Sequence, residues 1–325
     1  MRRGEVMHRE IAKRRKSLPF FAMQSEQVRE ISSDWHMMSE DMCNRIMPFG
    51  RSSRSPSEYR IAIEPDSQNL DEILRMALMT EHHEHSLEST IEDLFRQALR
   101  FVLLQGEAIY EIVYDSDDSP KQFVLVVLPP GESHTFMEVL TQVIPDREAA
   151  RRGLRVSGID IEVSNIVRFT FPDSLGGKSG TLGLIEAVGE LGNALSPAFV
   201  TEDRDAAHKE FGYGLLSDYH QLRELALARV TAKLGWNARS LMDKSTTEFY
   251  QFYRHLKFAR SLALIREHFL KILNGAIVTP FKRIGLEGEL KIMGIPTAEE
   301  LDLKLNGLLD GETSFEEVLR LAYPS

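Results

Sequence analysis

The stretch FVLLQGEAIYEIVYDSDDSPKQFVLVVLPPG, residues 101–131, decides the fold class. It starts at the end of a helical pattern and continues after Gly106 as two runs rich in Val, Ile, Tyr and Phe. β-Branched and aromatic residues favour strands, and the joining segment DSDDSPK has the composition of a turn. The sequence therefore predicts a β-hairpin directly after a helix, with no recognisable catalytic side chain beside it.

Helical and strand patterns occur on both sides of this hairpin. Strand patterns are found at 58–66, 154–163, 165–173 and 289–295. Helical patterns are found at 69–79, 86–105, 297–309 and 314–322. A longer one, 246–274, contains neither Gly nor Pro, and Asn274-Gly275 is expected to end it. Together these patterns predict an α+β fold.

The chain is expected to contain four consecutive regions. Residues 1–56 form a peripheral basic arm followed by a Pro/Gly/Ser/Arg-rich linker. Residues 57–200 form a mixed α/β domain, residues 201–285 a helical region, and residues 286–325 a strand followed by short helices.

The composition is that of a folded, water-soluble protein, with 325 residues of which 42% are hydrophobic and 27% charged. The sequence contains neither an apolar run of about 20 residues nor the apolar core of a signal peptide, so membrane insertion and secretion are not expected. Cys43 is the single cysteine. One thiol forms no internal disulfide, so a reducing compartment is expected.

Charge is distributed unevenly along a chain whose formal net charge is −10. Residues 1–16 hold seven Lys/Arg and two Glu, whereas residues 286–325 hold nine Asp/Glu and three Lys/Arg. The basic arm is a candidate contact for nucleic acid or an acidic partner, and a solvated terminus is an equally good interpretation. The candidate contact residues are Arg2, Arg3, Arg9, Lys13, Arg14, Arg15 and Lys16.

A glycine-rich segment, FPDSLGGKSG at 171–180, partly matches a phosphate-binding loop. A strand pattern precedes Gly177, Lys178 and Ser179, and a helical pattern follows them. The motif requires a first glycine where this chain has Pro172, which has no N–H to offer a phosphate. A surface loop is therefore the favoured interpretation, and no cofactor is predicted.

A histidine-rich segment, TEHHEHSLE, contains His82, His83 and His85. Imidazoles bind zinc or nickel, but this cluster lies between two predicted helices and lacks the i,i+4 spacing of a helical metal site. A polar loop is favoured, and no metal is predicted.

Arg75 and His82, with six residues between them, also fit the loose Arg…His spacing of small helical ribonucleases. No catalytic residue is predicted.

The order of these elements resembles that of the portal proteins of tailed phages over residues 57–310. In that family a helix and a G-x-A segment lead into strands that end in a proline-containing turn; here these are Gly106-Glu107-Ala108 and Leu128-Pro129-Pro130. A later strand runs through a glycine-rich loop, here Gly176 to Gly183, into a helix. The helix 245–274 is similar to the one that precedes the closing strand of portals.

The resemblance implies a wing-like α/β domain with long stem-like helices and a homo-oligomeric ring, the head-to-tail connector at the portal vertex of a virion. Such a ring is assembled in the host cytoplasm, and double-stranded DNA is packaged and ejected through it. Its implied partners are a packaging motor that hydrolyses ATP and neck, scaffold or capsid proteins, with no membrane. One departure is that 192–239 contains no convincing pair of clip strands.

Two other classes of function stay open. The first is an α+β interaction or regulatory protein of the cytoplasm that forms no ring. The second is an enzyme, either nucleotide-dependent through the loop 176–183 or a nuclease through Arg75 and His82.

Overall fold

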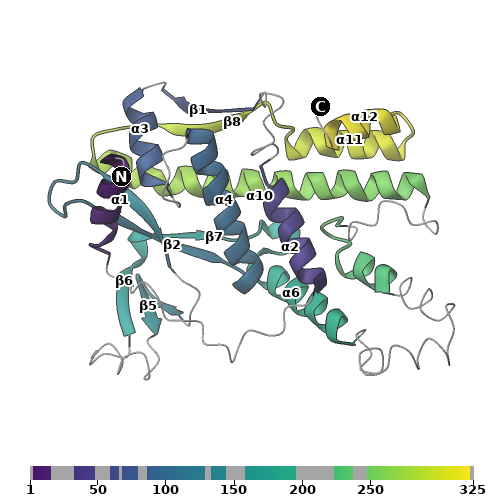
Figure 1. The fold of residues 1–325 in the computed structure, drawn as a ribbon, viewed down its shortest axis with the longest axis horizontal. Coiled ribbons are helices and arrows are strands. Elements are labelled where there is room, and N and C mark those ends of the chain that lie inside the picture. Colours follow the sequence, from purple (N-terminus) through teal and green to yellow (C-terminus); the bar gives the residue numbers. More distant parts are fainter. Residues whose placement is uncertain are drawn as a thin grey trace. The chain divides into compact units, whose positions relative to one another are not determined.

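The computed structural model has the α+β class that the sequence predicts, with helices and antiparallel sheets (Figure 1). It describes residues 3–15, 33–47, 59–65, 68–79, 86–128, 133–143, 158–194, 223–236 and 247–322. The chain divides into two compact units, each built from three segments. Unit 1 comprises Met1–Val28, Cys43–Phe171 and Arg266–Ile295, and unit 2 comprises Arg29–Met42, Pro172–Ile265 and Pro296–Ser325. These units cut across the four consecutive regions expected from the sequence.

An antiparallel sheet of three strands forms the centre of unit 1. Its order is β3-β2-β7, with β2 at Ala108–Tyr114, β3 at Phe123–Val127 and β7 at Ile166–Phe169. The β2–β3 hairpin that the sequence predicts is confirmed, with Ile112 opposite Leu125. Because β7 pairs with the other edge of β2, the hairpin contributes the central strand and one edge strand of the sheet.

Strand β2 is buried along its whole length because both faces of its sheet are covered. One face packs against α4 (Leu87–Gln105) and the C-terminal part of α10 (Glu248–Arg283). The Tyr110 hydroxyl donates to Gln97 of α4, and Phe169 makes an edge-to-face ring contact with Phe269 of α10. The other face meets α1 (Arg3–Ala12) and a second sheet. Burial on both faces explains why β2 is apolar at every position except Glu111.

The second sheet has the order β4-β5-β6, with β4 at Ser133–Phe136, β5 at Val139–Val143 and β6 at Gly158–Glu162. The sequence predicts β6 but not the hairpin of β4 and β5, since β4 is mostly polar and exposed and lacks an alternating apolar pattern. Leu140 and Ile161 pack against Ile109 of β2 and join the two sheets.

A two-stranded ribbon links distant parts of the chain in unit 1. Strand β1 (Arg60–Glu64) pairs antiparallel with β8 (Glu289–Met293), with Ala62 opposite Lys291. Helix α3 (Gln68–Ala77) follows β1.

Helix α4 starts at its cap Ser86, whose hydroxyl accepts from the Ser89 N–H, and is followed by Gly106. Both ends of α4 agree with the prediction.

Helix α10 is longer than the sequence indicates, because it runs through Asn274, Gly275 and Pro280 to Arg283. Asn274 does not cap the helix. Its side chain donates to the Leu290 carbonyl and accepts from the Leu290 N–H, at 2.9 Å each, and so binds β8. The helix ends instead at Arg283 and is followed by Gly285 in the left-handed conformation, where the Leu286 N–H donates to the Phe281 carbonyl.

The N-terminal 56 residues are not wholly peripheral, which corrects the prediction. Ile11 of α1 is buried against Val113 and Val124 of the central sheet. Helix α2 (Ser33–Arg45) also buries one face, including Trp35 and Met38. The prediction relied on the basic composition of this region and overlooked the few apolar residues through which it packs.

Unit 2 contains α6 (Gly177–Ala194), the N-terminal part of α10, α11 (Ala298–Leu309) and α12 (Phe315–Ala322). Residues 223–230 are also helical and lead into a turn at 231–235. The fully buried residues between α10, α11 and α12 are aliphatic, and the partly buried rings of Phe252 and Tyr253 pack against them. These buried residues are Leu256, Ala263, Ala298, Leu301, Leu308 and Val318. The described residues also include 3-10 turns at Val163–Asn165 in unit 1 and at Asp173–Leu175 in unit 2.

Candidate functional site

The basic arm is a helix that is docked on the central sheet of unit 1. Arg3 is the first residue of α1, while Arg2 and Lys16 lie outside the described residues. Lys13 and Arg14 are exposed, and Arg9 and Arg15 are half-buried. Only part of the predicted cationic surface therefore faces solvent.

Arg14 binds the acidic turn of the β2–β3 hairpin. Its guanidinium donates to the carbonyl of Asp115 and pairs with the carboxylate of Asp117 at 3.4 Å. Burial lowers the pKa of Arg15, and the nearby charge of Glu111 opposes this shift. The acidic turn and the basic arm, which the sequence presents as separate features, thus neutralise one another in part. Contact with nucleic acid through the rest of the arm stays a prediction.

The glycine-rich segment is a tight turn that runs straight into helix α6, and the loop expected at Gly176 to Gly183 is much shorter than predicted. Helix α6 begins at Gly177, and Lys178 and Ser179 lie exposed in its first turn. Thr181 is buried and donates its hydroxyl proton to the Gly177 carbonyl. The packing of this turn outweighs the low helix propensity of glycine.

The backbone donors of this turn are used within the turn itself. The Gly176 N–H donates to the Asp173 carbonyl at 2.8 Å and the Gly177 N–H to the Pro172 carbonyl at 3.1 Å. The Gly180 N–H donates to the Gly176 carbonyl at 2.8 Å. A phosphate-binding loop requires such N–H groups to point at the ligand. This geometry does not provide that cradle at the three glycines.

The predicted histidine cluster, His82, His83 and His85, lies outside the described residues. Within the described ranges, no group of three or more His, Cys, Asp or Glu side chains is placed to bind a metal ion. Arg75 is described, and its Nε lies 2.8 Å from a carboxylate oxygen of Asp71, one helical turn away.

An open groove of about 810 Å³ lies along β1 and α3 in unit 1, and Arg75 is part of its lining. Its wall includes charges of both signs, and the Ile61 N–H at its edge donates to the Glu88 carboxylate at 3.3 Å. The charged lining residues are Arg60, Glu64, Asp71, Glu72 and Arg75. This mixed lining favours no single class of small ligand.

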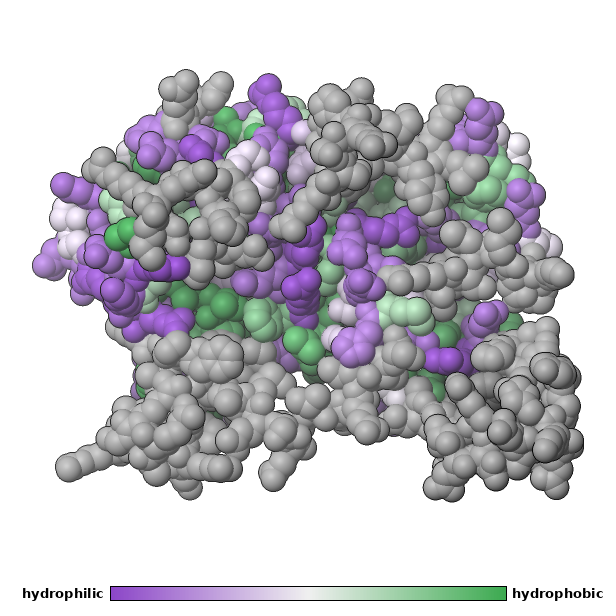
Figure 2. Space-filling view, viewed as in Figure 1, coloured by the Kyte–Doolittle hydropathy of each residue, from purple (hydrophilic) through white to green (hydrophobic). Residues whose placement is uncertain are grey.

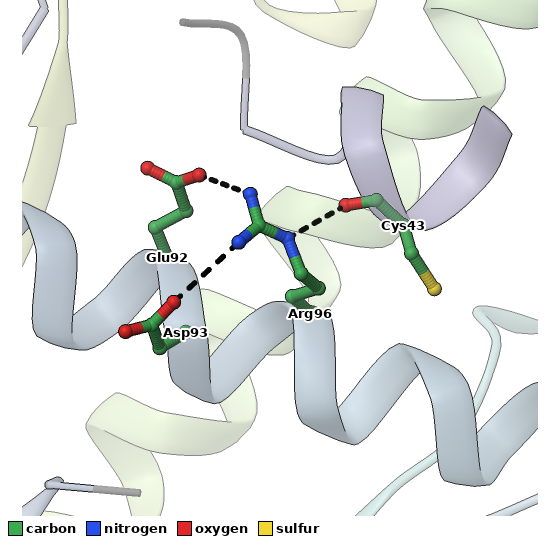
Figure 3. A network of polar contacts seen from close by, with 4 residues as sticks. All are labelled: Cys43, Glu92, Asp93 and Arg96. Atoms are coloured by element: carbon green, nitrogen blue, oxygen red, sulfur yellow. Dashed lines mark hydrogen bonds and ion pairs between the residues drawn. The ribbon is translucent and has the colours of Figure 1, made fainter. Parts of the chain in front are cut away.

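A buried polar network joins α2 to α4 in unit 1 (Figure 3). The Arg96 guanidinium pairs with Glu92 and Asp93 on its own helix and donates through Nε to the Cys43 carbonyl at 3.3 Å. Figure 3 shows the Cys43 thiol pointing away from the guanidinium. Burial, and then the nearby charges of Glu92 and Glu88, raise the pKa of Tyr59. Within unit 1 the network binds Cys43, in the last turn of α2, to α4, and the sequence offered no signal for it.

Charged and polar side chains cover much of the described surface in the view of Figure 2, with smaller apolar areas between them. Among the residues that the structure describes, the apolar side chains with the highest exposed fraction are Phe136 and Met137 at the tip of the β4–β5 hairpin, and Leu303 on α11. Among the described helices, none is both long enough and apolar enough to cross a bilayer.

Comparison with known proteins gives no match. No protein-family model matches the chain, and neither a curated protein nor a solved structure is significantly similar to it.

Proposed function

We propose that this protein is a portal-like ring protein, a structural component that conducts double-stranded DNA and carries out no catalytic step of its own. The observation that carries the proposal is the order of elements around the long helix α10 and the strand that follows it. In this proposal the ring stands at the portal vertex of a virion, and a separate motor supplies ATP hydrolysis.

The first half of this order supports the resemblance to portals. Helix α4 ends before Gly106, β2 begins at Ala108, and β3 is followed by Leu128, the first residue of the Leu-Pro-Pro sequence. Strand β7 then runs through the glycine turn into α6. These are the positions at which the family has its G-x-A segment, its proline turn and its glycine-rich connection.

The second half of the order is equally specific. Helix α10 has 36 residues, about 54 Å at 1.5 Å per residue, and leads directly into β8. Strand β8 closes against β1, and α11 and α12 follow it. A long helix, a closing strand and terminal helices are the arrangement that the resemblance implies.

The charge of the chain suits a conduit. Tight binding of DNA requires many Lys and Arg side chains that displace counterions from phosphates. This chain has 49 acidic and 39 basic residues. A wall with an excess of acidic groups repels the backbone of DNA weakly and lets it pass without gripping it.

The test is the mass of the full chain in solution, measured by mass photometry and followed by negative-stain imaging. A closed cyclic assembly of about a dozen copies with a central hole is expected, since heterologous contacts that close produce rings. The variants Lys178→Ala and His82→Ala should assemble as the wild-type chain does, because the proposal gives neither side chain a role. A monomer at every concentration would contradict the ring and favour an interaction protein.

A further inference from the structure

The ribbon of β1 and β8 in unit 1 has two outer edges, and they differ. Figure 1 shows the two strands side by side, and in the described part of the chain each is the only strand partner of the other. The outer edge of β8 is closed, because the Asn274 side chain binds both the N–H and the carbonyl of Leu290. Within the described residues, the outer edge of β1 has no comparable closure.

The pairing register shows which backbone groups of β1 point to its outer edge. Opposite residues of an antiparallel pair alternate between pairs that exchange hydrogen bonds and pairs whose groups point outward. Leu290 points outward to Asn274, so Ile63, which lies opposite it, points outward on the other side. Ile61 does the same, because its N–H donates to the Glu88 carboxylate at 3.3 Å. Ile61 and Ile63 therefore present their N–H and carbonyl groups to the outer edge.

Most of these backbone groups have no hydrogen-bond partner within the described residues. This is true of the Ile61 carbonyl and of both the N–H and the carbonyl of Ile63. The Ile61 N–H is bound by a side-chain oxygen of Glu88, which takes the place that the carbonyl of an added strand would have. Because unpaired groups at a strand edge are a template for pairing with another chain, the edge of β1 is suited to accept a further strand.

The open groove of about 810 Å³ gives access to this edge. All five residues of β1 line it, together with Leu87, Met293 and three residues of α3. A strand of this length extends over about 17 Å at 3.4 Å per residue. An extended backbone presents donors and acceptors to one side at every second residue, which is the spacing that Ile61 and Ile63 require.

The side chains of β1 determine what an added strand should carry. Ile61 and Ile63 are buried on one face of β1, whereas Arg60, Ala62 and Glu64 lie on the other. An antiparallel strand places its second and fourth residues beside Ile63 and Ile61, where apolar side chains extend the buried face. Its first and fifth residues lie beside Glu64 and Arg60, where a base and an acid complement the charges.

Arg60 is available for such a pair. It is exposed, and within the described residues it has no ion pair, whereas Glu64 pairs with Lys291 at 2.5 Å across the ribbon. We propose that the outer edge of β1 binds an extended segment of a partner protein as a third, antiparallel strand. The segment has the order base, apolar residue, any residue, apolar residue, acid.

This mode of recognition divides its tasks between backbone and side chains. Main-chain hydrogen bonds supply the affinity of an added strand, and its alternate side chains supply the specificity. The inference identifies a partner-binding surface within unit 1 and does not depend on the assembly of a ring.

The test measures binding of a fluorescently labelled peptide, Lys-Ile-Thr-Val-Glu, to the full chain by fluorescence anisotropy. In the proposed register the isoleucine of the peptide exchanges two hydrogen bonds with Ile63. Methylation of the isoleucine nitrogen removes one of them and should weaken binding by at least about tenfold. Methylation of the threonine nitrogen, which points away from β1, is the matched control and should change the Kd by less than about twofold.

The protein is unchanged in this comparison, so its folding does not affect the outcome. Saturable binding that is weakened only by the first methyl group supports the third strand. Absence of binding at millimolar peptide, or equal losses for the two methylated peptides, would overturn the inference.

A charge exchange tests the register. Arg60→Glu should weaken binding of the unmethylated peptide at least about threefold, because two acids then lie side by side. A peptide that ends in lysine instead of glutamate should restore binding to this variant. Weakening without restoration would overturn the antiparallel register.

Amide hydrogen exchange measured by NMR locates the bound peptide. At saturating peptide the Ile63 amide should exchange at least about tenfold more slowly, because it then has an acceptor. The Ala62 amide, whose side of the strand faces β8, serves as the internal reference and should change less. Slower exchange confined to residues outside β1 would overturn the assigned site.

Discussion

The two parts of helix α10 bury their side chains in different ways. From Arg254 to Arg266, in and around unit 2, residues on almost every side of the helix are buried, including two arginines and a serine. From Phe269 to Phe281, in unit 1, burial follows one stripe at every fourth residue. One continuous helix is therefore surrounded by other residues on most sides in unit 2, whereas in unit 1 it is amphipathic and packs against the sheet through one face.

The difference shows what each part depends on. The stripe in unit 1 packs aromatic rings together, with centroids of Phe269 and Phe169 at 5.1 Å. The part of α10 in unit 2 includes Arg254, whose guanidinium donates to the Ala228 and Trp236 carbonyls and to the Thr231 hydroxyl. Gly235 lies so close to α10 that a Cβ there would meet the Phe258 nitrogen at 2.6 Å. Burial of apolar area stabilises the part of α10 in unit 1, and hydrogen bonds of the buried Arg254 position the part in unit 2.

The largest expected effect comes from removing the aromatic stripe. Phe269→Ala should lower the free energy of unfolding by about 3–5 kcal/mol, because Phe269 is fully buried against Phe95 and Phe169. Urea unfolding followed by circular dichroism measures this change, and amide exchange should accelerate in β2. Phe249→Ala, an exposed residue of the same helix, should change stability by less than about 0.5 kcal/mol. Equal losses for the two variants would contradict the described packing.

Removing the buried guanidinium should have the next largest effect. Arg254→Leu removes the donor that these three acceptors share, although the Trp236 carbonyl still accepts from the Thr231 hydroxyl, and should cost about 3 kcal/mol. Trp35 and Trp236 both lie in unit 2, so tryptophan fluorescence reports on this unit during unfolding. Arg260→Leu removes a partly exposed ion pair with Asp302 and should cost at most about 1 kcal/mol. If Arg260→Leu lowers the free energy of unfolding more than Arg254→Leu does, the assigned role of the buried guanidinium is wrong.

Alkaline pH should weaken unit 1 through its buried tyrosine. Burial raises the pKa of Tyr110, whose hydroxyl donates to Gln97 at 3.0 Å. Above about pH 10 the unfolded chain loses this proton while the folded chain keeps it, so stability falls as pH rises, by at most about 1.4 kcal/mol per pH unit. Amide exchange of β2 between pH 9 and 11, extrapolated to a common intrinsic rate, should show this slope. Tyr110→Phe should reduce this slope by up to about 1.4 kcal/mol per pH unit and leave the contributions of Tyr59 and Tyr114, whose pKa values burial also raises. An unchanged slope would show that Tyr110 does not cause it.

The smallest expected effect is at the exposed arginine of unit 1. Arg14→Ala removes the contacts with Asp115 and Asp117 and should cost less than about 1 kcal/mol, because water screens exposed pairs. The loss should shrink further in high salt. Thermal melts at low and high ionic strength measure it, and a salt-independent loss would indicate that packing by the Arg14 side chain matters more than its charge.

Much of the secondary structure follows from the sequence, because local patterns specify it. The β2–β3 hairpin, both ends of α4 and strand β8 agree with the prediction. The predicted end of α10 at Asn274 was wrong, since Asn274 binds a strand that lies 16 residues further along the chain. For the candidate site, sequence patterns located the basic arm and the glycine turn. They did not show that the donors of the turn are used internally or that Arg14 binds the hairpin turn.

The sequence by itself determined the α+β class, the central hairpin and the opposite charges of the two ends of the chain. These depend on residue type and on spacing over a few residues, which are local properties. Only the tertiary structure decided that β8 closes on β1, that Arg254 is buried and Arg96 partly buried with their partners, and which faces of α1 and α11 stay exposed. Those features arise from contacts between residues far apart in sequence, and no local pattern encodes which distant group a side chain will meet.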